Sequence, residues 1–242
     1  MSTNRQKKIS DNYHRILERI DSTAVSAGRN PEDVRLVVVT KTQPIDVIYN
    51  VVEAGAIDLG ENYVEEATPK IQSLGMDKKI RWHMIGHVQS RKAQHVCEYF
   101  QYVHSVDSIK LAKRLNKFSQ TLKKTLPIWI ELNVSGEDSK YGWHIETQDD
   151  LDHILPVIKQ ISSLPKLKLL GLMTIPPYSE EPEASRIYYQ RLYKFQKYIA
   201  DRLQLVGFTQ LSMGMSSDFE IAIQEGSTCV RIGQAILGPR PS

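Results

Sequence analysis

The lysine at position 41 ends an apolar run and is the residue in this chain whose position best suits covalent chemistry. Val37, Val38 and Val39 precede Thr40 and Lys41, a pattern typical of a strand buried on both faces. An ammonium group in a partly desolvated site has a lowered pKa, and the neutral amine can attack a carbonyl carbon. Lys41 is therefore a candidate for binding a carbonyl ligand as a Schiff base. The alternative is a solvated lysine that only ends a strand.

A second group of residues, late in the chain, has the features of an anion site. Ser216 precedes a segment expected to be helical from about residue 218, and the unpaired amides at a helix start attract anions. Ser217 and Glu220 have the spacing of a capping box. Gly233 follows another apolar run and, lacking a Cβ, allows the backbone to approach a ligand closely. We expect a phosphate to bind near Ser216 and Gly233, with ordinary turn residues as the alternative.

The pattern of apolar residues predicts strands that alternate with helices. The expected strands are residues 36–41, 57–62, 81–86, 102–107, 127–134, 167–175, 210–215 and 229–237. Such alternation requires parallel strands with right-handed crossovers. Eight units in roughly 210 residues, without a glycine cluster after the first strand, favour a closed barrel over an open doubly wound sheet. We predict an α/β fold, a single (β/α)8 TIM barrel domain over residues 1–242, with an N-terminal helix at about 5–28 and the barrel at about 35–238.

The closed barrel brings the two candidate sites together. The carboxyl ends of its strands meet at one rim, where ligands bind, and phosphate sites commonly use the loops after strands seven and eight. Ser216 and Gly233 fall on those two strands, at their ends, and Lys41 ends the neighbouring first strand. A small molecule with both a phosphate and an aldehyde fits this arrangement, and pyridoxal 5′-phosphate is such a molecule.

Arg231 lies two residues before Gly233 on the last expected strand. An arginine that faces the pyridine nitrogen of pyridoxal phosphate keeps this nitrogen unprotonated and weakens the cofactor as an electron sink. The alternative is a salt bridge from Arg231 to Asp218 or Glu220.

Asn62 and two histidines also lie at or near strand ends. Asn62 can hydrogen bond a ring hydroxyl of the ligand or cap the helix that follows. His83 and His87 have the spacing of two zinc ligands on a helix, but on a strand and its loop this spacing does not converge. We therefore expect no metal site. The polar loop 135–142 is either a lid over the rim or a plain connection.

Composition and charge exclude several classes of partner. The formal net charge is +3, without a basic block, so we expect no nucleic acid. Cys97 and Cys229 are far apart and lie in apolar stretches, which fits a reducing, cytoplasmic compartment. We expect neither a signal peptide nor a membrane span, because the first residues are polar and basic and no apolar run is long enough.

Several multi-residue motifs, in order over about residues 35–238, resemble those of the pyridoxal phosphate homeostasis proteins, which look like the barrel domain of alanine racemase standing alone. The motifs are VTKT (39–42), GENYV (60–64), WHMIGH (82–87), GLMT (171–174), LSMGMSSD (211–218) and VRIG (230–233). The resemblance implies pyridoxal phosphate bound covalently to a lysine, without established catalytic turnover. It also implies a role in keeping the free aldehyde at safe levels and in supplying it to other proteins.

The same resemblance assigns roles to individual residues. It implies that Lys41 is the Schiff-base lysine, that Arg231 faces the pyridine nitrogen, and that Ser216 with the backbone around Gly233 and Gln234 holds the phosphate. Gln234 replaces a threonine or other small residue of the family, which leaves its backbone amide as the available donor. The further residues implied to line the pocket are Asn62, His83, Met173, Ser212, Gly214 and Met215.

Three functions from different classes remain open. A cofactor carrier is the first, and we expect it, as a monomer with pyridoxal phosphate-dependent apoenzymes as recipients. An amino-acid racemase is the second, but racemases of this fold take their second base, a tyrosine, from a further β-domain that we do not expect here. Tyr63, Tyr141 or Tyr178 would have to substitute for it. The third is an enzyme that attacks a phosphorylated sugar through Lys41, which predicts a colourless protein.

Overall fold

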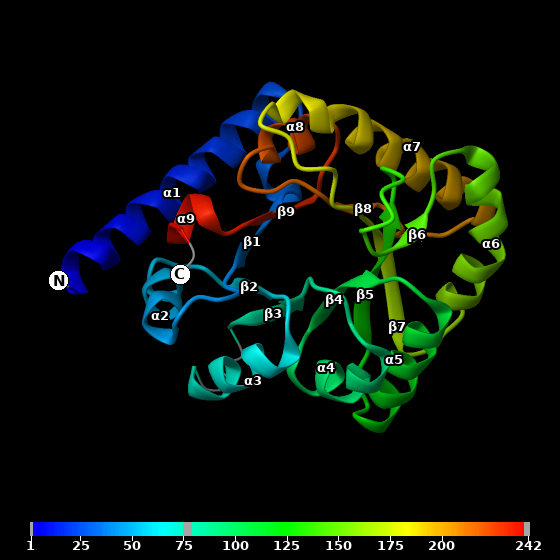
Figure 1. Cartoon of the computed structure of the whole chain (residues 1–242), viewed down its shortest axis with the longest axis horizontal. Helices are drawn as coiled ribbons and strands as arrows, with labels where there is room; N and C mark the ends of the chain where they lie inside the picture. Colours follow the sequence, from blue (N-terminus) through cyan, green and yellow to red (C-terminus); the bar gives the residue numbers. More distant parts are fainter. Residues whose placement is uncertain (1, 75–78, 240–242) are drawn as a thin grey trace.

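A closed ring of 8 parallel strands forms the centre of this computed structural model, which describes residues 2–74 and 79–239 (Figure 1). The strands of the ring are β1 (Arg35–Val39), β2 (Asp58–Glu61), β3 (Arg81–Met84), β4 (Tyr102–Val106), β5 (Leu126–Asn133), β7 (Leu167–Met173), β8 (Gln210–Ser212) and β9 (Cys229–Ile232). They pair in the order β4-β3-β2-β1-β9-β8-β7-β5, and a further pairing of β4 with β5 closes the ring. The predicted (β/α)8 barrel is therefore confirmed, and the open sheet is wrong.

The helices lie around the outside of the ring (Figure 1). They are α1 (Ser2–Ser26), α2 (Ile45–Glu53), α3 (Val64–Ser73), α4 (Ala93–Tyr99), α5 (Ile109–Thr121), α6 (Gln148–Ser162), α7 (Arg186–Leu203), α8 (Phe219–Gln224) and α9 (Gln234–Leu237), with 3-10 turns at Pro31–Asp33, Ser90–Lys92 and Pro182–Ser185. The predicted N-terminal helix is α1, which packs against α2, α8 and α9. None of the helices in the described residues is long and apolar enough to cross a membrane.

Three local features differ from the expectation based on the sequence. The predicted last strand, 229–237, is β9 followed by the short helix α9, because the strand ends at Ile232. A two-residue strand, β6 (Trp143–His144), pairs with the end of β5 and lies outside the ring. The expected capping box at Ser217 is absent, because α8 begins at Phe219 and its N-cap residue, Asp218, instead accepts a hydrogen bond from the Met215 amide at 2.7 Å.

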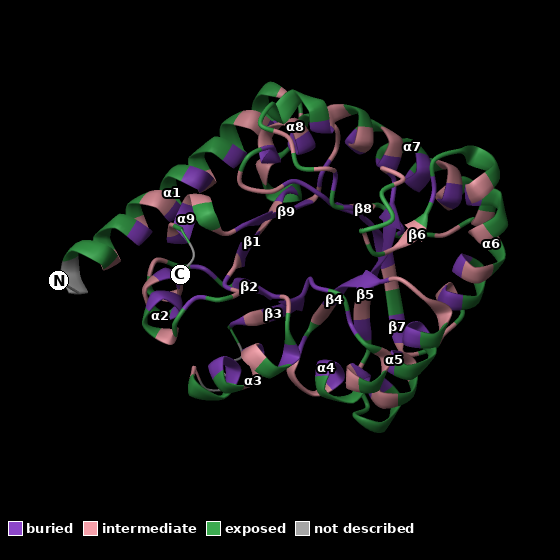
Figure 2. Cartoon of the chain, viewed as in Figure 1, coloured by how far each residue is buried: buried purple, intermediate pink, exposed green. Residues whose placement is uncertain are grey.

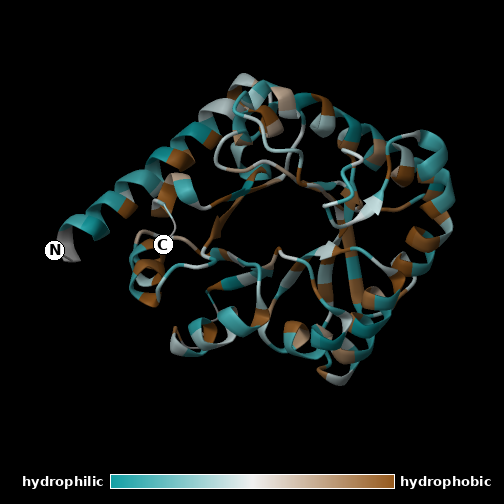
Figure 3. Cartoon of the chain, in the orientation of Figure 1, coloured by the Kyte–Doolittle hydropathy of each residue, from teal (hydrophilic) through white to brown (hydrophobic). Residues whose placement is uncertain are grey.

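Apolar side chains fill the space between the ring and the helices. Buried residues follow the strands and the inward faces of the helices, whereas the outward faces are exposed and hydrophilic (Figures 2 and 3). β5 is buried at every position except Pro127, as expected for a strand covered on both faces. This packing fixes the strand ends relative to one another, which a site at the rim requires.

Both cysteines are buried in this packing. Cys97 lies on α4, where its Sγ is 3.5 Å from Leu115 O and from Ser119 Oγ of α5. Cys229 lies on β9. Burial raises the pKa of Cys97 and raises that of Cys229 to about 11. Neither thiol is therefore a reactive thiolate at neutral pH.

Candidate functional site

A cavity of about 430 Å³ opens at the carboxyl ends of the strands. Its volume lies within the range of about 300–1,000 Å³ that is usual for small-molecule sites. Seven of the candidate residues line it: Lys41, Asn62, Met215, Ser216, Arg231, Gly233 and Gln234. The barrel therefore brings the lysine, the arginine and the expected phosphate-binding residues into one cavity, although they are up to about 190 residues apart in the sequence.

The other four candidates, His83, Met173, Ser212 and Gly214, are not among the described residues that line this cavity. His83, Met173 and Ser212 are fully buried, and Met173 packs with Trp129 in a small apolar cluster. Gly214 has a φ of +98°, and a Cβ there would be 2.6 Å from the Cβ of Ala222. Gly214 therefore shapes the turn after β8.

Seven lining residues were not singled out as ligand-binding candidates from the sequence: Val39, Gln43, Ile85, Ile175, Tyr178, Ser217 and Gly238. Ile85 and Ile175 follow the ends of β3 and β7 within two residues. Both lie inside the strands predicted from the sequence, 81–86 and 167–175, but an apolar side chain near a strand end gives no sign of ligand binding. Tyr178 lies in the longer loop after β7, where no spacing rule applies.

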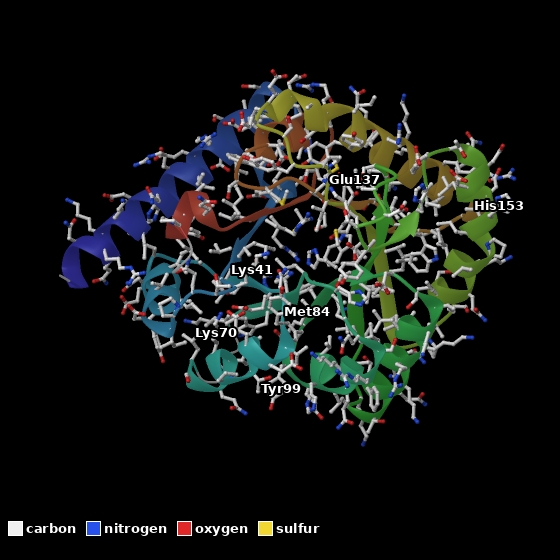
Figure 4. All side chains as sticks on the ribbon, in the orientation of Figure 1. Lys41, Lys70, Met84, Tyr99, Glu137 and His153 are labelled. Atoms are coloured by element: carbon white, nitrogen blue, oxygen red, sulfur yellow. The ribbon has the colours of Figure 1, made fainter. Side chains whose placement is uncertain are left out.

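Lys41 is presented by an unusual turn. In Figure 4 the side chain of Lys41 points into the ring. Thr42, the next residue, has a φ of +62°, which is rare for a β-branched residue. Its amide donates a hydrogen bond to Glu66 Oε1 of α3. A carboxylate on a neighbouring helix therefore helps to hold the backbone next to Lys41 in this conformation.

A buried ion network lies behind this turn. Lys70 Nζ donates to Thr40 O at 2.9 Å and to Glu61 Oε1 at 2.8 Å, and it also pairs with Glu66. Thr40 Oγ1 donates to the same oxygen of Glu61 at 2.6 Å. Burial raises the pKa of Glu61, and Lys70 partly offsets this rise. The network connects Thr40, the residue before Lys41, with β2 and α3.

Arg231 is 4% exposed and is held by the barrel wall. Its Nη1 donates to Ser212 Oγ at 2.6 Å and its Nη2 to Thr174 O at 2.9 Å. Burial lowers its pKa, but a guanidinium remains charged. Within the described residues Arg231 forms no salt bridge, so the alternative pairing with Asp218 or Glu220 is wrong; Glu220 pairs with Arg19.

Ser216 and the start of α9 form the polar end of the cavity. The Ala235 amide lies 3.4 Å from Ser216 Oγ. A Cβ on Gly233 would be 2.9 Å from Val39 O, so glycine is required for the close contact of this turn with β1. A hydroxyl and backbone amides suit the oxygen atoms of a phosphate. Asn62 also lines the cavity and does not cap α3, whose N-cap residue is Tyr63 without a side-chain cap.

The loop between β5 and β6 is fastened to the rim. Lys140 Nζ donates to Ile175 O at 3.1 Å, and Tyr141 stacks on His87 with ring centroids 3.9 Å apart. His87 Nδ1 in turn lies 2.8 Å from Asp107. Beneath the loop, burial raises the pKa of Glu131 to about 7. Across the described residues, no three His, Cys, Asp or Glu side chains converge as a metal site would require.

Comparisons with known proteins agree with these features. The family model "Alanine racemase, N-terminal domain" matches residues 12–241. Pyridoxal phosphate homeostasis proteins of Pseudomonas aeruginosa and Escherichia coli K12 are 41% and 37% identical to the chain, over 96% of this chain and 96–97% of theirs.

Solved structures show the same fold. PipY of Synechococcus elongatus, solved with pyridoxal phosphate bound, is 30% identical with a TM-score of 0.80, over 92% of this chain and 100% of PipY. Alanine racemase of Clostridium difficile, at 16% identity and a TM-score of 0.65 over 96% of this chain and 58% of the racemase, shares the fold. The family model and the relatives at 37–41% identity both cover nearly the whole chain. The chain therefore belongs to the pyridoxal phosphate homeostasis protein family.

Proposed function

We propose that this protein binds pyridoxal 5′-phosphate reversibly as a Schiff base with Lys41 and holds it for supply to other proteins, without specific catalytic turnover. The observation that carries this proposal is the shared cavity of about 430 Å³, which Lys41, Ser216 and Arg231 all line. PipY, a relative of nearly equal length, was solved with pyridoxal phosphate bound.

The residues of the cavity fit the chemical groups of the cofactor. When bound, the cofactor supplies an aldehyde that reacts with amines and a ring that can accept electrons. Lys41 provides the amine, and Ser216 with the amides of Gln234 and Ala235 provides donors for the phosphate. Arg231 provides donors for the ring nitrogen and cannot give up its proton to it. This pairing would weaken the ring as an electron acceptor.

The racemase alternative needs a second base that faces the cofactor. Of Tyr63, Tyr141 and Tyr178, only Tyr178 lines the cavity, and this residue is 87% exposed. Tyr141 is engaged in the stack on His87. A phenol open to solvent is poorly positioned for proton transfer, so this arrangement supports the carrier.

The decisive experiment is borohydride reduction of the protein loaded with pyridoxal phosphate, followed by mapping of the pyridoxyl peptide. We expect the adduct on Lys41 and its absence in Lys41→Ala, which should remain folded. Lys140→Ala is the matched control, because Lys140 lies at the same rim. An adduct on Lys140 or another lysine would overturn the assignment, and a wild-type protein that cannot be loaded would refute the cofactor and favour the phosphosugar hypothesis.

Two further measurements test the carrier role. We propose that the protein acts as a cytoplasmic monomer and that pyridoxal phosphate-dependent apoenzymes receive the cofactor. Size-exclusion chromatography with light scattering tests the oligomeric state. Incubation of the loaded protein with an apoenzyme should restore the activity of that enzyme, whereas incubation with L-amino acids should yield no D-isomer by chiral chromatography.

A further inference from the structure

A chain of hydrogen bonds crosses the interior of the barrel and ends at Arg231. We call its members the interior relay: Asp58 on β2, His83 on β3, His104 on β4 and Ser212 on β8. Asp58 Oδ1 lies 2.8 Å from His83 Nε2, and His83 Nδ1 lies 2.9 Å from His104 Nε2. His104 Nδ1 lies 2.7 Å from Ser212 Oγ, which accepts the 2.6 Å bond from Arg231. Asp58, His83 and His104 lie on successive paired strands, whereas β4 of His104 and β8 of Ser212 do not pair. The bond between His104 and Ser212 therefore crosses the ring.

The two ends of the relay set the direction of every hydrogen bond in it. Arg231 has only donors, so Ser212 Oγ accepts from it and donates its own proton to His104 Nδ1. His104 then carries its proton on Nε2 and donates to His83 Nδ1. His83 likewise carries its proton on Nε2 and donates to Asp58, whose carboxylate only accepts. Each donor thus points away from the cationic end and toward the anionic end.

Charge and packing support this arrangement. Burial lowers the pKa of both histidines, that of His104 well below its usual range, so both rings are neutral. Burial raises the pKa of Asp58, but hydrogen bonds from His83 and Arg81 outweigh it and leave the pKa lowered. His83 stacks on Tyr102 with centroids 4.4 Å apart, and His104 stacks on Trp129 at 4.0 Å. These stacks hold the planes of both rings and therefore the directions of their hydrogen bonds.

We propose that the interior relay positions Arg231 to bind the pyridine nitrogen of the cofactor, an inference that rests on the proposed function of this cavity. A buried guanidinium without a salt bridge is stable only where its donors are well satisfied. The relay supplies Ser212 Oγ as an acceptor for Arg231, and the chain of hydrogen bonds behind it ends at the carboxylate of Asp58. Hydrogen bonds in such a chain polarise and strengthen one another. Its members are positioning residues, because they act on the cofactor through Arg231.

The first test needs no cofactor. In ¹⁵N-histidine-labelled protein, NMR should show both His83 and His104 as neutral tautomers with the proton on Nε2. A coupling across the hydrogen bond should connect His83 Nδ1 with His104 Nε2. A proton on Nδ1 of either ring, or a charged ring at neutral pH, would overturn the relay.

The second test compares Ser212→Ala with Ser212→Thr in protein loaded with pyridoxal phosphate. The alanine variant should shift the visible absorption maximum of the bound cofactor and weaken its apparent affinity about tenfold, equivalent to about 1.4 kcal/mol. The threonine variant keeps the hydroxyl and should restore the wild-type spectrum. Ser105→Ala is the matched control, because Ser105 is a buried serine of β4 that donates to Gly86 O and lies outside the relay.

The outcomes separate the relay from the proposed function. If the wild-type protein does not bind pyridoxal phosphate, the proposed function fails, whatever the histidine tautomers are. If the wild-type protein binds it and Ser212→Ala has the wild-type spectrum and affinity, the relay does not position Arg231. If Ser105→Ala shifts the spectrum as much as Ser212→Ala, the effect is general loosening of the barrel and the proposal is also overturned.

Discussion

Replacement of Lys70 by methionine tests the buried ion network next to Lys41. Methionine keeps most of the length of the side chain but removes the ammonium group, which bonds Thr40 O, Glu61 and Glu66. Lys70 belongs to α3, on the outer side of the ring, whereas Lys41 points inward (Figure 4). The variant should therefore weaken the support of Lys41 without touching the cavity.

The burial of the Lys70–Glu61 pair determines how much stability the Lys70→Met variant should lose. The side chain of Glu61 is fully buried and that of Lys70 is 10% exposed, so this pair is shielded from solvent. Removal of one partner of a buried pair typically costs about 3–5 kcal/mol, because a charge is left buried without compensation. Glu66 is more exposed, at 28%, and can recover hydration. We expect a loss of about 3 kcal/mol in the free energy of unfolding at pH 8.

The stability that Lys70→Met loses should also depend on pH. Burial raises the pKa of Glu61, and Lys70 lowers it; without Lys70 this pKa must rise further. At low pH Glu61 is protonated in both proteins, and the difference in its charge disappears. A raised folded-state pKa means that stability is lost as pH rises through it. The stability deficit of Lys70→Met should therefore be smaller at pH 5 than at pH 8.

The assay is urea unfolding of both proteins at pH 5 and pH 8. Lys92→Met is the control, since Lys92 forms a more exposed pair with Glu65, whose side chain is 64% exposed, and should lose less than about 1 kcal/mol. A deficit below about 1 kcal/mol for Lys70→Met at pH 8, or a larger deficit at pH 5 than at pH 8, would refute the reasoning.

Three further substitutions test other parts of the structure. Because burial raises the pKa of Glu131 to about 7, the stability that its protonated form provides should be lost as pH rises from about 4.5 through 7. Glu131→Gln should remove this loss, which is on the order of 3 kcal/mol. In denaturant titrations the unfolding free energy of the variant should therefore change little between pH 5 and 8. Gly171→Ala would place a Cβ 1.7 Å from Gln210 O, a backbone atom of the neighbouring strand. This clash should lower the unfolding free energy by about 3 kcal/mol or abolish folding, as judged by circular dichroism. Arg19→Ala removes the surface pair with Glu220, whose side chains are 44% and 42% exposed, and should lower the unfolding free energy by less than about 1 kcal/mol; a larger loss would show that α1 depends on it.

The barrel and the residues of its rim were readable from the sequence because both follow from local patterns. Apolar runs such as 36–39 predict buried strands, and a residue at the carboxyl end of such a strand, such as Lys41, must lie at the rim of a barrel. In each case the residues that interact are close together in the sequence.

The features that were missed depend on contacts between distant residues. Ser212 and His104 are 108 positions apart, and no spacing rule joins them. Asp58 is the first residue of β2, and nothing around it in the sequence predicts its bond with His83. The positive φ of Thr42 could not be expected either, because residues of this type avoid that region and the carboxylate that accepts the Thr42 amide lies on another element.

Because both cysteines are buried, their reaction with a thiol reagent would measure local opening of the protein. The chain has 2 cysteines, and neither Cys97 nor Cys229 is exposed by more than 1%. A thiol reagent therefore finds no target on the folded surface. Cys97 lies between α4 and α5, and Cys229 lies on β9 beside the strand that leads to Lys41. Labelling at Cys97 would report separation of the outer helices, and labelling at Cys229 would report opening of the ring. The rates at the two positions would show whether these regions open together, and whether bound cofactor slows one of them more than the other.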